Sequence, residues 1–244
     1  MIEQDTSAYW RKLLALDQAQ PANVLNKHRT WHRYLRPILY KLISLPLRVY
    51  CPEKVVGLEN LPARPPYIIA ANHASSMDYA VVAWAMGKRR EELYPITTKL
   101  FYDHPFTSFW IKVAANAVRI DTEDEFFPAL RAAAQVLKAG KAVYINPEGT
   151  RSVDGSILPF RPGVGVLAVE TGVPIVPVYI AGTSKALPTG WIFPRPYPVA
   201  VSFGKAIAME PYIEKKRSVQ AYDVYKEVTE QLRQRIVALS RSPY

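Results

Sequence analysis

Cysteine is nearly absent from the sequence: Cys51 is the single one among 244 residues. One thiol excludes an intramolecular disulfide framework and leaves no second cysteine for a zinc cluster, so we expect no metal site and a reducing cytosol. The residues around Cys51 are Val49, Tyr50 and Pro52. We interpret Cys51 as a small buried hydrophobic residue rather than a nucleophile.

Long apolar runs are also missing. No uncharged apolar stretch approaches the roughly 18 residues that a helix needs to cross a bilayer. The first residues, Met1 to Asp17, carry charges of both signs and lack the apolar stretch of a secretory signal. We therefore expect a protein that does not cross a membrane. A hydrophobic content of 49% in 244 residues predicts one large domain with an appended segment.

Acidic residues are missing from one stretch, between Gln18 and Pro52. The basic residues there account for much of a net charge of +10, and they are Lys27, Arg29, Arg33, Arg36, Lys41 and Arg48. Such a block of charge suits a polyanion, which is anionic lipid, nucleic acid or an acidic protein. We divide the chain accordingly into a basic segment at residues 1–50 and a domain at residues 51–244.

The basic segment has the pattern of an amphipathic helix. Between Val24 and Leu47, apolar residues recur at alternating steps of four and three, namely Trp31, Leu35, Ile38, Leu42 and Leu45. Pro37 is expected to kink this helix or to divide it in two. The pattern suits a helix lying in the plane of a membrane, or a helix packed on the domain with its charged side in water. Nucleic acid fits less well, because no recognition module accompanies the charge.

The rest of the chain alternates short apolar runs with helical stretches. After a proline-rich connector at residues 61–66, we predict strands at 67–71, 94–98, 117–120, 142–145, 175–180 and 199–203. We predict helices from Phe126 to a stop at Gly140, from Gly163 to Gly172, and from Ser218 to Leu239. This alternation predicts an α/β fold with a mostly parallel central sheet flanked by helices.

A first polar loop, Asn72-His73-Ala74-Ser75-Ser76-Met77-Asp78, follows a predicted strand. A carboxylate bonded to one ring nitrogen of a histidine can fix its tautomer, so His73 and Asp78 can act as a general base with its orienting acid. We place His73 in the turn after the strand and Ser75 or Ser76 as the cap of a helix. Asp78 then lies in the first helical turn, where the helix dipole favours negative charge.

A second polar loop, Asn146-Pro147-Glu148-Gly149-Thr150-Arg151-Ser152, also follows a strand. It can hold a phosphorylated polyol, with Arg151 pairing with the phosphate and Glu148 accepting from a hydroxyl. The alternative is a surface loop with a Glu–Arg ion pair. Because ligands of such sheets lie beyond the carboxyl ends of the strands, we expect both loops to face one crevice.

Together these blocks resemble the glycerolipid acyltransferase family, in its 1-acylglycerol-3-phosphate O-acyltransferase branch. The blocks occur in the family's order between Gly57 and Ile180. The stronger ones are Asn-His-x4-Asp at 72–78, Val-Arg-Ile-Asp at 118–121, Pro-Glu-Gly-Thr-Arg-Ser at 147–152 and Thr-Gly-Val-Pro-Ile-Val-Pro-Val at 171–178. The weaker ones stand at 57–62 and 159–163. Several blocks in order are far more specific than one.

The resemblance implies transfer of a fatty acyl group from a thioester, on coenzyme A or acyl carrier protein, to a glycerol hydroxyl. His73 would deprotonate the hydroxyl while Asp78 steadies the imidazolium, and the alkoxide would attack the thioester directly. Ser75 and Ser76 are then not nucleophiles. Beyond the acyl-thioester co-substrate, the resemblance implies neither a cofactor nor a metal.

The implied acceptor is lysophosphatidic acid, and the product is phosphatidic acid. The implied ligands of the glycerol phosphate are Lys99, Arg119, Glu148, Gly149, Thr150 and Arg151. The chain departs from the family at Ala115–Val118, where the family often has glycine and an aromatic residue ahead of the arginine. Arg119 can alternatively pair with Asp121 or Asp124.

The resemblance also gives the basic segment a purpose, because acceptor and product are membrane lipids. Family members without a spanning helix are thought to lie on the bilayer through an N-terminal helical pair, here residues 8–16 and 24–47. We therefore expect a peripheral protein on the cytoplasmic face of an anionic membrane, with no nucleic acid partner. The alternatives are another lysophospholipid or a glycolipid as acceptor, and a non-catalytic basic membrane-binding protein.

Overall fold

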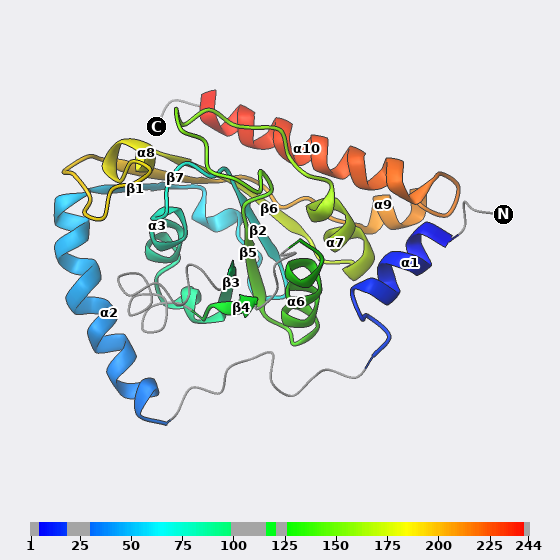
Figure 1. Cartoon of the computed structure of the whole chain (residues 1–244), viewed down its shortest axis with the longest axis horizontal. Coiled ribbons are helices and arrows are strands. Elements are labelled where there is room, and N and C mark those ends of the chain that lie inside the picture. Colours follow the sequence, from blue (N-terminus) through cyan, green and yellow to red (C-terminus); the bar gives the residue numbers. More distant parts are fainter. Residues whose placement is uncertain (1–4, 19–29, 99–115, 121–125, 242–244) are drawn as a thin grey trace.

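A twisted sheet runs through the centre of the molecule, with helices on both faces (Figure 1). The computed structural model describes residues 5–18, 30–98, 116–120 and 126–241. The strands in these residues are β1 (Glu53–Val56), β2 (Ile68–Ala71), β3 (Leu93–Thr98), β4 (Val118–Ile120), β5 (Ala142–Ile145), β6 (Ile175–Ala181) and β7 (Val199–Phe203). They lie in the order β1-β7-β6-β2-β5-β3-β4.

The sheet is mostly parallel, as the sequence predicts. β7 is antiparallel to β6, whereas every other neighbouring pair of strands runs parallel. The strands β2 to β7 begin and end within one residue of the predicted runs. The edge strand β1 was not predicted. It is four residues long and only alternately half-buried, so it lacks the continuous apolar run that marks the central strands.

The helices form two layers, one on each face of the sheet (Figure 1). In the described residues they are α1 (Asp5–Leu13), α2 (Thr30–Tyr50), α3 (Asp78–Ala85), α6 (Phe126–Lys138), α7 (Gly163–Thr171), α8 (Thr183–Ala186), α9 (Glu210–Lys215) and α10 (Ala221–Arg241), with short 3-10 helices η1 (Leu58–Asn60) and η2 (Gly87–Glu92). The predicted helices at α6, α7 and α10 are confirmed, and the C-terminus of α7 is capped by Gly172, whose φ of 69° suits glycine.

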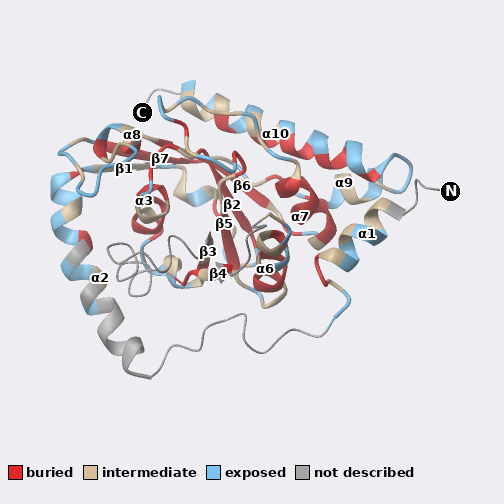
Figure 2. Ribbon diagram, viewed as in Figure 1, coloured by how far each residue is buried: buried red, intermediate tan, exposed pale blue. Residues whose placement is uncertain are grey.

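Both faces of β2 are buried, which explains why the central strand reads as an unbroken apolar run (Figure 2). Ile68 and Ala70 pack with α6, α7 and α10 in one core. Ile69 and Ala71 pack with α3 in a second core on the other face. The polar residues that follow β2 therefore emerge between two apolar layers, at the carboxyl end of the sheet.

The N-terminal segment contains two helices with different surroundings. α2 is one continuous helix that includes Pro37, so the proline does not divide it. The predicted start at Val24 lies outside the described residues. α1 packs on the domain, and the fully buried Leu14 directly after it belongs to the core with α6, α7 and α10. The boundary between residues 1–50 and 51–244 stays a prediction. Among the residues described, none of the helices combines the length and the apolar character that spanning a bilayer requires.

Candidate active site

The loops that follow β2 and β5 lie side by side, because these strands are parallel neighbours in the sheet. Two hydrogen bonds join the loops across His73: its backbone N–H donates to Glu148 Oε1 at 2.9 Å, and its carbonyl accepts from the Ser152 N–H at 2.8 Å. The Asn146 side-chain amide also donates to the carbonyl of Asn72, at 3.0 Å. The two polar loops are thus one connected structure.

His73 and Asp78 are in direct contact. His73 Nδ1 lies 2.9 Å from Asp78 Oδ2, and the same oxygen accepts from the backbone N–H groups of Ala74 at 2.8 Å and Ser75 at 2.9 Å. Asp78 is 1% exposed, whereas the His73 side chain is 25% exposed and lines a cavity. The carboxylate therefore fixes the imidazole so that its other nitrogen, Nε2, can serve a substrate.

The serines of the turn have a different role from the predicted one. The helix begins at Asp78 as expected, but its N-cap is Met77, which makes no side-chain capping bond. The predicted cap position at Ser75 or Ser76 is therefore one or two residues too early, although the Ser75 hydroxyl does accept from the Met77 N–H at 3.3 Å, while the Asp78 carboxylate accepts from the N–H groups of Ala74 and Ser75. The buried Ser75 hydroxyl donates to the Leu187 carbonyl at 2.7 Å. Its proton is thus already used in tying the turn to the segment after α8.

Glu148 lies against the turn that carries His73 and is not part of the cavity lining. It is 3% exposed, and the bond that Oε1 makes is with the backbone of His73. Burial raises the pKa of Glu148, although the N–H groups of His73 and Leu158 lower it in part. A direct contact between Glu148 and a substrate stays a prediction. The geometry shows a carboxylate that holds the turn.

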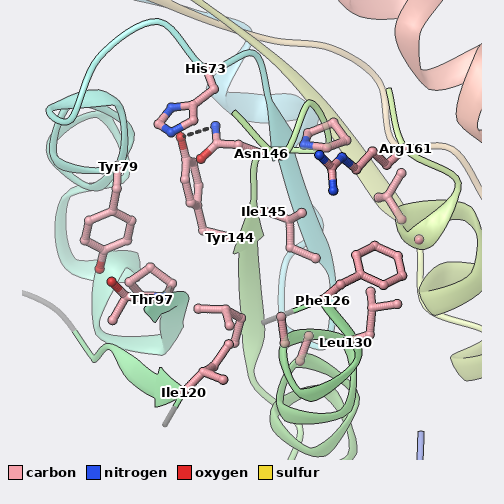
Figure 3. Close-up of a pocket in the computed structure, with 18 of the residues that line it drawn as sticks. His73, Tyr79, Thr97, Ile120, Phe126, Leu130, Tyr144, Ile145, Asn146 and Arg161 are labelled. Atoms are coloured by element: carbon pink, nitrogen blue, oxygen red, sulfur yellow. Dashed lines mark hydrogen bonds between the residues drawn. The ribbon is translucent and has the colours of Figure 1, made fainter. Parts of the chain in front are cut away.

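A cavity of about 660 Å³ opens beside His73 (Figure 3). One end is polar and is lined by His73, Asn146, Gly149, Thr150, Arg151 and Arg161. The end away from His73 is mostly apolar: Ile120, Phe126 and Leu130 lie there together with Thr97 (Figure 3), and Ile96, Ile145 and Val164 also line the cavity. Figure 3 shows His73 and Arg161 at the polar end on opposite sides of β5, with Phe126 and Leu130 below them. The cavity can therefore hold a ligand with a charged head and an apolar chain.

Arg161 is a cavity residue that was not predicted as a ligand, although its block at 159–163 supported the family resemblance. Its backbone N–H donates to the Pro147 carbonyl at 2.8 Å, which joins it to the second loop. Gly149 has φ 73°, and a Cβ there would lie 2.7 Å from Arg161 Nε. Glycine at 149 thus lets the guanidinium lie across the loop. In the sequence Arg161 simply follows a proline and a phenylalanine, and nothing in that context predicts that its side chain packs on Gly149.

Tyr144 and Asn146 were also not predicted as site residues. The Tyr144 hydroxyl accepts from Asn146 Nδ2 at 3.0 Å, next to His73 (Figure 3). Burial, and to a lesser extent the Asp78 carboxylate, raises the pKa of Tyr144 well above its ordinary value. Tyr144 thus stays a neutral phenol. In the sequence it reads simply as one residue of an apolar strand.

The remaining predicted ligands differ in what the structure says of them. Gly149, Thr150 and Arg151 line the cavity. Arg119 lies in β4, where its backbone pairs in register with Thr97 of β3, but its side chain is not among those described. Lys99 lies outside the described residues. In the described part of the chain, no group of three or more His, Cys, Asp or Glu side chains is arranged to bind a metal ion.

Comparison with protein families gives a match to the acyltransferase family model over residues 53–181. This range includes both polar loops and all six of the resembling blocks in full. The family resemblance predicted from the sequence is thereby confirmed.

Curated relatives carry the name 1-acyl-sn-glycerol-3-phosphate acyltransferase. A chloroplastic enzyme of Brassica napus is 30% identical over 167 residues, which are 66% of this chain and 46% of the relative. The human alpha enzyme is 31% identical over 130 residues, 52% of this chain and 45% of the relative. The chain thus spans about half the length of these relatives.

Among solved structures, the 1-acyl-sn-glycerophosphate acyltransferase PlsC of Thermotoga maritima has a similar fold. The TM-score is 0.65 and the sequence identity is 22%, with 100% of this chain and 93% of that chain covered. The similarity supports the α/β architecture with its flanking helices.

Proposed function

Because the chain belongs to the acyltransferase family, we propose that it transfers a fatty acyl group from a thioester to the free sn-2 hydroxyl of 1-acylglycerol 3-phosphate. The product is phosphatidic acid. The observation that carries this proposal is the oriented His73–Asp78 pair at a cavity with guanidinium groups at one end and apolar side chains at the other. A lysophosphatidate has the matching chemistry, a hydroxyl between a phosphate and an acyl chain.

The reaction proceeds by direct attack. His73 Nε2 removes the proton of the acceptor hydroxyl, and Asp78 stabilises the imidazolium that forms. The alkoxide oxygen attacks the thioester carbonyl, and the tetrahedral intermediate then breaks its carbon–sulfur bond. The thiolate leaves with the proton that the imidazolium returns. Tyr144, a neutral phenol beside His73, is a candidate donor for the oxyanion.

The polar end of the cavity binds the glycerol phosphate. Arg151 and Arg161 supply charge-assisted hydrogen bonds, while Gly149 and Thr150 let the loop approach closely. Lys99 and Arg119 stay predicted ligands of the phosphate, as the family resemblance implies. Glu148 holds the turn through the His73 backbone and contributes to acceptor binding through the position of that turn. The apolar end accommodates an acyl chain.

Substitution of His73 tests the assignment of the base. The variant His73→Ala should keep the melting temperature of the parent and lose about 100-fold to 10,000-fold in turnover of lysophosphatidate, because the general base is removed. Val153→Ala is the matched control, since Val153 is 87% exposed and lies one residue beyond the His73–Ser152 bond. Near-normal turnover in His73→Ala would show that another group acts as the base.

A panel of acceptors and donors tests the substrate. Purified protein is assayed with lysophosphatidate, with lysolipids that carry a larger headgroup, and with a glycolipid, each with acyl-coenzyme A and with acyl carrier protein thioester. Turnover of the headgroup-bearing or sugar acceptors without turnover of lysophosphatidate would replace the proposed acceptor. An absence of turnover with every pair would favour a non-catalytic membrane-binding protein.

The membrane-facing part of the proposal concerns α2. Ile38, Leu42, Leu45 and Val49 recur along one side of this helix and are 56–79% exposed. A row of exposed aliphatic side chains in a stretch without acidic residues suits a helix that lies in the surface of an anionic bilayer. The protein is accordingly proposed to bind the cytoplasmic face of a membrane peripherally.

A further inference from the structure

The loop between α8 and β7 exposes three large apolar side chains in succession. Trp191, Ile192 and Phe193 are 52%, 59% and 70% exposed. Single exposed apolar residues are normal on a protein surface, but consecutive large ones mark a contact site. Neither polar loop of the active site uses these residues, so they call for an explanation of their own.

The loop has a defined fold that presents these side chains outward. The Arg195 N–H donates to the Ala186 carbonyl at 2.6 Å, and the Trp191 N–H donates to the Pro188 carbonyl at 3.1 Å. The Arg195 guanidinium also stacks on the Trp191 ring, with 3.8 Å between its central carbon and the ring centroid. A contact made by this loop therefore costs little ordering of the backbone.

The loop lies beside the C-terminal end of α2 (Figure 1). The Cys51 thiol, one residue beyond α2, donates to the Arg195 carbonyl at 3.3 Å. A shallow apolar groove joins the two segments, and it is lined by Leu45, Pro46, Val49, Tyr50 and Pro196. The exposed face of α2 and the loop thus form one continuous apolar surface, built from segments about 140 residues apart in the chain.

The charges around this surface favour a bilayer. No acidic residue occurs between residues 171 and 209, just as none occurs between 18 and 52. Two cations lie against aromatic rings here: Arg195 of the loop on Trp191, and Lys185 of the adjoining α8 at 5.4 Å from the Tyr197 ring centroid. Aromatic rings backed by cations suit the interface of a bilayer, where the rings enter and the cations meet lipid phosphates. An acidic protein would instead be recognised by cations that point outward.

The loop is also connected to the active site. The carbonyl of Leu187, at its start, accepts the hydrogen bond from the Ser75 hydroxyl at 2.7 Å. Ser75 is in the turn that carries His73, and its backbone N–H is bound by Asp78. The position of the loop is therefore coupled to the position of the His73 turn through the Ser75 side chain.

We propose that the 188–196 loop is a second membrane contact, which inserts Trp191, Ile192 and Phe193 into the interface of an anionic bilayer beside α2. A second contact away from the axis of α2 restricts how far the molecule can tilt about that axis on the bilayer. The proposal rests on the proposed function only in that the acceptor is a membrane lipid.

A site-specific fluorophore tests insertion directly. Cys51 is fully buried, so a thiol-reactive, polarity-sensitive dye placed on Ile192→Cys labels the loop selectively. Vesicles of phosphatidylglycerol and phosphatidylcholine should shift its emission to the blue, and brominated lipid should quench it. The matched control is the dye on Tyr222→Cys, at an exposed position of α10. An Ile192 signal that stays like the Tyr222 signal would overturn the proposal.

Vesicle binding of full-length variants gives the second readout. Trp191→Ser, Ile192→Ser and Phe193→Ser combined should weaken binding by about tenfold or more, because three buried apolar side chains are lost from the interface. Val219→Ser with Tyr222→Ser is the control, since both positions are 42–46% exposed. Vesicle binding equal to the parent would overturn the proposal. The proposal would also be overturned if the triple variant kept vesicle binding but lost binding to purified acyl carrier protein. That result would assign the loop to an acidic protein.

These measurements separate the two proposals. Both readouts record binding without turnover, so a chain that transfers no acyl group can still insert the loop. Conversely, a chain that acylates lysophosphatidate without entering vesicles through this loop would keep the proposed function and lose the second membrane contact. The dye experiment uses a single exposed position, so it stays decisive if the triple variant fails to fold.

Discussion

The two N-terminal helices share an amphipathic pattern but bury it differently. α1 is covered by the domain: Leu14, directly after it, is fully buried, and Trp10 packs against the same core. α2 keeps one side against the domain, where Tyr40 and Leu47 pack, while Ile38 on another side is 56% exposed. The predicted helical pair is therefore a packed helix followed by a helix with an open apolar face.

The two helices differ because the domain contacts them with different side chains. Three side chains of α6 donate to carbonyls at the end of α1 and in the turn after it: Arg131 to Leu13 at 2.7 Å, Gln135 to Leu14 at 3.2 Å, and Lys138 to Leu16 at 2.7 Å. These bonds satisfy the unpaired carbonyls of a helix end. The outer face of α2 receives no comparable cover from the described residues, so its apolar side chains remain available for a membrane.

The same substitution directly after α1 and within α2 should have unequal effects on stability. Leu14→Ala removes a fully buried side chain from the core and should lower the free energy of unfolding by about 2–5 kcal/mol. Leu42→Ala, at a position 66% exposed, should change it by less than about 0.5 kcal/mol. Urea unfolding measures both. Equal losses would mean that α2 is held in the fold as tightly as the end of α1.

A pH-dependent effect is expected where α2 meets the sheet. Burial raises the pKa of Glu53 in β1 from 4.5 to about 7, although the adjacent Arg48 lowers it in part. The folded state therefore resists ionisation of Glu53. Its stabilising contribution is complete below about pH 4.5 and is lost as the pH rises through about 7.

Glu53→Gln removes this titration. Relative to the parent, the variant should gain up to about 3 kcal/mol in the free energy of unfolding between pH 5 and pH 8. Glu59→Gln, an exposed carboxylate in η1, is the matched control and should follow the parent at both pH values. If Glu53→Gln lost stability at pH 8 instead, the Arg48–Glu53 ion pair would outweigh the cost of burying the charge.

Much of the fold follows from local patterns in the sequence. Strands such as β5 and helices such as α7 coincide with apolar runs that have glycines near their ends, so their limits are nearly those of the predicted runs. The short, half-exposed β1 carries no such pattern. It exists because it pairs with β7, whose residues follow about 145 positions later. Pairing with a distant strand cannot be inferred from the residues of β1 themselves.

In the candidate site, too, contacts within one short segment could be predicted, whereas contacts between distant segments could not. The pairing of His73 with Asp78 was predictable, because both residues belong to one short turn. The packing of Arg161 on Gly149 and the bond from Ser75 to Leu187 depend on segments that meet only in the folded chain. Helix amphipathicity likewise predicted an apolar face for the helix at residues 24–47, whereas the donors from α6 that cover α1 lie more than 100 residues away from it in the chain.

Polar substitutions on the exposed face of α2 should have the smallest effect on stability. They should also distinguish the role of α2 from that of α1 most clearly. Leu42→Ser with Leu45→Ser should leave the free energy of unfolding within about 1 kcal/mol of the parent, because both positions are 66–67% exposed. Binding to anionic vesicles should nevertheless fall by about tenfold, since two side chains no longer enter the bilayer. Deletion of residues 1–50 would be a poorer test, because it also removes Leu14 from the core. Unchanged vesicle binding in the double variant would show that the exposed face of α2 meets something other than lipid.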